Sequence, residues 1–145
     1  MIRRAFAALT LAVLLAAPTL ADEKADLKAM EGTWLPTSAE LGGQKFPDEQ
    51  RKAIKLEIAD GKFTATVNGV VDKGTFKLDT KAKPKAMDIT GNDGPNKDKT
   101  YPAIYELSGD TLKVCYALEG KDRPTKLETK SGTLTFLVIY ERAKK

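Results

Sequence analysis

Cysteine chemistry is the first reactivity to consider, because the chain contains one cysteine, Cys115, and no histidine. Without histidine there is no Ser-His-Asp or Cys-His site, no imidazole proton shuttle and no common zinc ligand set. In an alternating strand, Cys115 shares a face with Lys113, opposite the apolar face of Leu112 and Val114. We therefore expect an outward thiol whose pKa is somewhat lowered by Lys113, and we interpret it as a structural or incidental residue.

The twenty acidic residues could support two other kinds of chemistry. The stretch from Asp88 to Asp98 resembles a calcium loop in composition, but such a loop needs glycine at its sixth position and glutamate at its twelfth. Counted from Asp88, those positions are Asp93 and Lys99. Glycoside hydrolysis needs two acids facing each other across a cleft, and we expect no acid on an apolar face. The sequence thus predicts no catalytic residue, no metal site, no cofactor and no enzymatic activity.

Short alternating strands separated by turns make up most of the chain. Asp60-Gly61 and Asn68-Gly69 are typical of tight hairpin turns, because type I′ turns need positive φ at both central residues. Residues 22–30 favour a short helical turn, and Leu127 is placed in a further short strand. We predict an all-β fold, an antiparallel up-and-down barrel of eight or nine strands. The main strands are expected at residues 33–40, 54–58, 62–67, 70–78, 86–90, 101–107, 111–118 and 133–141.

The barrel interior is the main candidate for a binding site. An eight-stranded barrel is just wide enough either to fill with side chains or to hold one small ligand. A solidly packed interior is the simpler interpretation, but small residues such as Ala65 and Ala103 leave room for a pocket. The tyrosines would supply polar groups on an apolar wall. The predicted ligand-binding residues are Ala65, Phe76, Tyr101, Tyr105, Tyr116 and Phe136.

The first 21 residues have the features of an export signal. Arg3 and Arg4 precede an uncharged apolar stretch, and Thr19-Leu20-Ala21 provides small residues before a cleavage site at Asp22. We predict a signal peptide over residues 1–21, a single domain over residues 22–145, and a periplasmic or secreted protein without stable membrane insertion. Removing the two arginines leaves 22 basic and 20 acidic residues. The two signs are mixed along the chain, which argues against nucleic-acid binding.

Gly32-Thr33-Trp34, preceded by a short helical turn, resembles the opening motif of the lipocalins and their relatives. In that superfamily the tryptophan lies at the closed end of an eight-stranded barrel, and an arginine from the last strand packs across it. The resemblance implies a lipocalin-like barrel in which Gly32, Trp34 and Arg142 close one end.

A second resemblance covers residues 28–142. The segments MEGTW, SAELGG, GTFKLD, KPKAMDI, DGPNKDKT, IYEL, GDTLKVC and GKDRPT occur in this order along the chain. In sequence and spacing they resemble a family of small exported domains that is common in planctomycete bacteria. The family implies kinship and no particular mechanism.

These features predict an exported, non-enzymatic binding domain that holds a small apolar or amphipathic ligand in the mouth of the barrel. The alternative is a protein-interaction or inhibitor module of the cell envelope. In that case an envelope protein would bind the exposed loops 91–100 and 120–124.

Overall fold

The computed structural model describes residues 20–144. The predicted signal peptide lies outside this range except for Leu20 and Ala21, which begin the first helix. The elements follow in the order α1 (Leu20–Ala29), β1 (Gly32–Leu41), β2 (Gln44–Lys45), α2 (Asp48–Lys52), β3 (Ile54–Ala59), β4 (Lys62–Val67), β5 (Val70–Asp79), β6 (Ala86–Asp93), β7 (Thr100–Ser108), β8 (Thr111–Ala117) and β9 (Thr135–Arg142).

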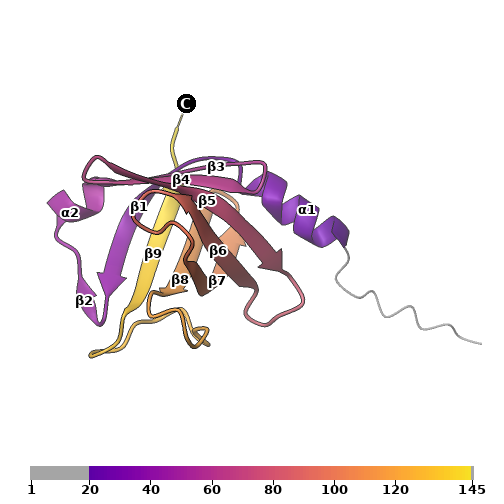
Figure 1. Ribbon diagram of the computed structural model, residues 1–145. Helices are drawn as coiled ribbons and strands as arrows, with labels where there is room; N and C mark the ends of the chain where they lie inside the picture. Colours follow the sequence, from indigo (N-terminus) through magenta and orange to yellow (C-terminus); the bar gives the residue numbers. More distant parts are fainter. Residues whose placement is uncertain (1–19, 145) are drawn as a thin grey trace, which may run out of the picture.

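Eight of these strands form a closed antiparallel barrel (Figure 1). β1 is followed around the barrel by β3 to β9, each strand pairing with its neighbour in sequence. The barrel closes because β1 also pairs with β9, from Trp34 opposite Arg142 to Leu41 opposite Phe136. β2 extends the sheet as a ninth strand beside the end of β1. The predicted all-β, up-and-down barrel with a short N-terminal helix is confirmed.

The two hairpin turns formed as their sequences predicted. Asp60 and Gly61 have φ values of 52° and 72°, and Asn68 and Gly69 have values of 51° and 79°. Positive φ at both central residues is the requirement that Asp-Gly and Asn-Gly meet at low cost. These turns set the register of β3, β4 and β5. In β3, Ile54, Leu56 and Ile58 are buried, and the residues between them are exposed.

The observed elements differ from the predicted ones at three places. Residues 118–134 form a long connection between β8 and β9, so Leu127 lies in no strand. α2 was not predicted, since its five polar residues have no apolar periodicity. β6 runs to Asp93 rather than ending at Thr90, because an extra residue in β6, Asn92, shifts the register opposite Lys73 and Gly74 and lets the pairing with β5 continue.

The hairpin order sorts the connections into two ends of the barrel. One end, which we call the closed end, carries α1, the turns at 60–61 and 109–110, and the loop 80–85. The other end, the open end, carries α2, the turn at 68–69, the loop 94–99 and the segment 118–134. Figure 1 shows α1 and α2 on opposite sides of the barrel. None of the helices within residues 20–144 has the length and apolar character needed to cross a membrane.

The segment 118–134 covers part of the outer face. Ile104 and Cys115 pair across β7 and β8 on outward positions, yet both are almost completely buried. Arg123 donates hydrogen bonds to the backbone oxygens of Met87 and Ala103, at 3.0 and 2.9 Å, and so holds the segment against the strands. The barrel therefore has an apolar patch outside as well as a core inside.

Candidate functional site

Trp34 and Arg142 lie together at the closed end. The Trp34 side chain is fully buried, and the guanidinium carbon of Arg142 lies 4.4 Å from its ring centroid. Such a contact contributes on the order of 0.5–2 kcal/mol. The guanidinium also donates to the backbone oxygens of Ala29 and Glu31 and to Asp110. Arg142 therefore joins α1, β1 and β9 at this end.

The same contacts explain two features of the Gly32-Thr33-Trp34 motif. Trp34 Nε1 donates to the backbone oxygen of Met30 at 2.8 Å, which satisfies a carbonyl at the C-terminal end of α1. Gly32 has a φ of 132°, and a Cβ there would lie 2.9 Å from Arg142 Nη1. A side chain at position 32 would therefore collide with the arginine. Contacts of these three residues therefore connect the end of α1 to β1 and β9.

Tyr105 belongs to the closed end and not to the cavity described below. Its hydroxyl donates to Asp26 Oδ2 of α1 at 2.7 Å, and Lys85 pairs with the same carboxylate oxygen at 2.9 Å. Burial, reinforced by the hydrogen bond to Asp26, raises the pKa of Tyr105 well above its usual value. Tyr105, which the sequence analysis expected to bind ligand, therefore does not line the cavity, because its hydroxyl is directed toward α1.

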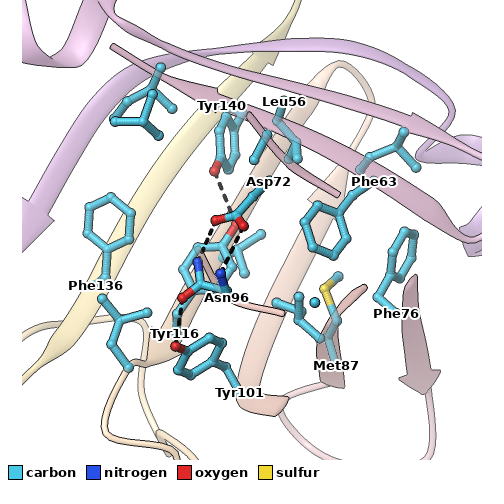
Figure 2. A pocket seen from close by; sticks show the side chains of 18 of the residues that line it. Leu56, Phe63, Asp72, Phe76, Met87, Asn96, Tyr101, Tyr116, Phe136 and Tyr140 are labelled. Atoms are coloured by element: carbon cyan, nitrogen blue, oxygen red, sulfur yellow. Dashed lines mark hydrogen bonds between the residues drawn. The ribbon is translucent and has the colours of Figure 1, made fainter. Parts of the chain in front are cut away.

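A cavity of about 330 Å³ occupies the barrel interior toward the open end. Figure 2 shows its side chains converging from several strands. The wall is almost entirely aliphatic and aromatic, and it reaches the half-exposed Val67 at the end of β4. The lining residues are Leu41, Phe46, Ile54, Leu56, Ile58, Phe63, Ala65, Val67, Asp72, Phe76, Met87, Ile89, Gly91, Asn96, Tyr101, Leu112, Val114, Tyr116, Leu118, Phe136 and Tyr140.

The cavity wall contains five of the six residues that the sequence analysis proposed for ligand binding. They are Ala65, Phe76, Tyr101, Tyr116 and Phe136. Strand alternation places each of them on the inward face. The ring of Phe136 contacts those of Phe46 and Tyr116, with centroids 5.4 and 5.8 Å apart. Phe46, from the connection between β2 and α2, was not predicted because it lies outside any alternating strand.

Two tyrosines, the partly buried Tyr116 and the buried Tyr140, supply one polar group of the wall. The hydroxyls of Tyr116 and Tyr140 are 3.1 Å apart and share a hydrogen bond. Burial raises the pKa of Tyr116, and it raises that of Tyr140 to about 12. Both phenols therefore stay protonated at neutral pH. One hydroxyl donates to the other, so the pair keeps one proton for a further acceptor.

Asp72, Asn96 and Tyr101 form the second polar group (Figure 2). The backbone N–H of Asn96 donates to Asp72 Oδ1 at 3.0 Å, and its side-chain amide donates to Oδ2. The hydroxyl of Tyr101 donates to Asn96 Oδ1 at 2.8 Å. The expectation that no acid lies on an apolar face was wrong: Asp72 has the same strand parity as the inward Phe76, and it pairs with Ala65.

The end of β6 and the loop 94–99 pack closely together and against β5, and this packing places Asn96 beside Asp72. A Cβ on the buried Gly91 would collide with the backbone oxygen of Asn96, and one on Gly94 would lie 2.7 Å from Asp72 Oδ1. The backbone N–H groups of Gly91 and Asp98 also donate to Lys99 and Gly91, respectively. The composition of this stretch predicted an exposed, turn-rich loop. Composition alone could not predict that the Asn96 side chain faces the cavity.

Cys115 faces outward but is fully buried under the segment 118–134, and its Sγ donates to the backbone oxygen of Glu128 at 3.5 Å. Burial raises the pKa of the thiol to about 11, so the expected lowering by Lys113 was wrong. Burial disfavours the charged thiolate, and this outweighs the lowering that was expected from Lys113.

No family model matches the chain, and no curated protein matches it.

Proposed function

We propose that this protein is an exported, non-enzymatic, lipocalin-like binding domain that holds one small apolar or amphipathic molecule in the barrel cavity. The observation that carries this proposal is an apolar cavity of about 330 Å³ in the barrel interior, with a few polar groups on its wall. Ligand pockets commonly span about 300–1,000 Å³ and are mostly apolar with a few polar groups. Burying apolar ligand surface contributes roughly 25 cal/mol per Å².

The alternative, an interaction or inhibitor module acting through loops 91–100 and 120–124, has less support. Two side chains of those loops, Asn96 and Arg123, are bonded to the barrel rather than presented to a partner. Arg123 also pairs with Asp88 on β6. The cavity is therefore the better candidate for the binding site.

Export is the cellular setting of this proposal. Cleavage after Ala21 would remove two residues of α1 and keep Asp26, the partner of Tyr105 and Lys85. The mass of the protein exported by its native host should correspond to a chain that begins at Asp22. An intact Met1 on membrane-bound protein would contradict this.

Filling the cavity tests the binding function. We expect the mature protein to bind the neutral dye N-phenyl-1-naphthylamine, measured by fluorescence titration. Ala65→Phe should abolish binding, because the new ring extends into the cavity from β4. Thr66→Phe, which adds the same ring on the outward position next to it, should bind the dye as the wild type does. Lys121→Glu in the exposed loop should also leave binding unchanged.

Two results would overturn the proposal. The first is an absence of dye binding to the wild-type protein. The second is unchanged binding in an Ala65→Phe variant whose circular dichroism matches the wild type.

A further inference from the structure

The lining of the cavity contains one charged side chain. Of its 21 residues, only Asp72 carries a charge, and neither lysine nor arginine contributes to the wall. The basic residues of the described chain thus lie outside the cavity. Any ligand in the cavity meets one carboxylate and no cation.

Asp72 is fixed in place without being neutralised. Asn96 provides both of its hydrogen bonds within the described residues, one to each oxygen, and both donors are neutral. No ion pair includes Asp72 in residues 20–144. A carboxylate has about four acceptor sites, so each oxygen keeps capacity for a further donor. Asp72 is half-buried beside apolar neighbours, where unpaired charge is costly.

Tyr101 adds a second acceptor to this polar corner. Its proton is committed to Asn96 Oδ1, which leaves the lone pairs of its oxygen. Asn96 Oδ1 is in turn occupied by that proton. The corner formed by Asp72, Asn96 and Tyr101 therefore favours a ligand group that donates hydrogen bonds, and its charge favours a cation.

We propose that the cavity selects an amphipathic amine: an apolar chain or ring that fills the interior, with an ammonium group that pairs with Asp72 at the open end. A neutral alcohol fits the hydrogen bonding without the charge. A fatty-acid carboxylate would place like charges together, which costs affinity strongly in a partly desolvated site. This inference rests on the proposed binding function and names its ligand class.

Three probes with one chain and different head groups test the selection. Decylammonium, decanol and decanoate compete with N-phenyl-1-naphthylamine for the mature protein at pH 7.5, below their aggregation limits. In the wild type, decylammonium should bind at least about tenfold more tightly than decanoate, with decanol between them. This order can be measured whether or not any variant folds.

Substitutions assign the selection to Asp72. Asp72→Asn should reduce the ratio between decylammonium and decanoate to below about threefold, with both competitors measured against the dye affinity of the same variant. Asp93→Asn is the matched control: it removes the same charge from an exposed residue of the open end that does not line the cavity. Its head-group order should remain that of the wild type.

The outcomes separate the two proposals. If the dye does not bind the wild type, the binding function itself fails. If the dye binds but decanoate equals or exceeds decylammonium, the amine selection fails and the binding function stands. Equal head-group ratios in Asp72→Asn and the wild type would likewise overturn the role of Asp72.

Discussion

The two ends of this barrel are built from the same eight strands, but their inward side chains have different surroundings. At the closed end, Trp34, Arg142 and Tyr105 each bond to α1 or to the backbone that follows it. At the open end, the inward residues line a cavity. Exposed apolar side chains, including Val70 at 54 % and Leu134 at 50 % exposure, lie beside its mouth.

The difference follows from what meets the inward side chains. A helix covers the closed end, so the large residues there pack against it and their polar atoms find backbone partners. The open end carries α2 and the long connection 118–134, and small residues such as Ala65 and Gly91 lie on the cavity wall there. We infer that the closed end holds most of the stability and that the open end is free to bind.

The largest expected effect is the loss of the tryptophan. Trp34→Ala should lower the free energy of unfolding by about 3–5 kcal/mol, because it leaves a cavity and removes the partner of Arg142. Urea titration measures this. Leu134→Ala at the open end is the control, since an exposed side chain should change stability by no more than about 0.5 kcal/mol. Equal effects of the two substitutions would abolish the contrast between the ends.

The same substitution at two tyrosines, one at each end, tests the comparison with a smaller expected loss of stability. Tyr105→Phe removes a hydrogen bond to the carboxylate of Asp26 and should cost about 1.5–3 kcal/mol. Tyr101→Phe removes a bond to the neutral amide of Asn96 at a half-buried position, and should cost about 0.5–1 kcal/mol. Dye binding should be unaffected by Tyr105→Phe. A larger loss of stability from Tyr101→Phe would reverse our assignment of the two ends.

The smallest expected effect concerns the segment 118–134, which connects strands at the open end. Cys115 lies beneath it, so iodoacetamide should label the native protein slowly at pH 8, and Arg123→Ala should speed labelling several-fold by releasing the segment. Lys121→Ala, in the same segment, is the control. Rapid labelling of the wild type would show that the segment does not shield the thiol.

The raised pKa of Cys115 also has a consequence for stability. The folded thiol stays protonated until about pH 11, whereas the unfolded thiol ionises near its ordinary value of 9.0. Between these values the unfolded state binds fewer protons, so stability falls as pH rises. The contribution of this group is fully present below about pH 9.

Strand alternation and turn residues were enough to predict the barrel. Asp60-Gly61 and Asn68-Gly69 could be identified locally because only positive φ values close such turns, and they fixed the register of three strands. Parity within the strands then placed Ala65, Phe76, Tyr116 and Phe136 inward. The same rule could have revealed Asp72, which lies four residues before Phe76 on the same face.

Depth along the barrel could not be predicted in this way. Tyr101 and Tyr105 have the same parity on β7, yet one lines the cavity and the other bonds to α1. Alternation reports which face of a strand a residue occupies, and it carries no information about what lies opposite that face.

The sequence by itself therefore determined the strands, their order and the inward side of each, since these depend on neighbours one to four residues apart. Only the tertiary structure decided where the interior is filled and where it is empty, because a cavity is the small difference between the space a barrel encloses and the side chains that enter it. It also decided that Asn96 meets Asp72, 24 residues away, and that Cys115 is covered. Such contacts depend on how a loop folds back onto the sheet, which no local pattern records.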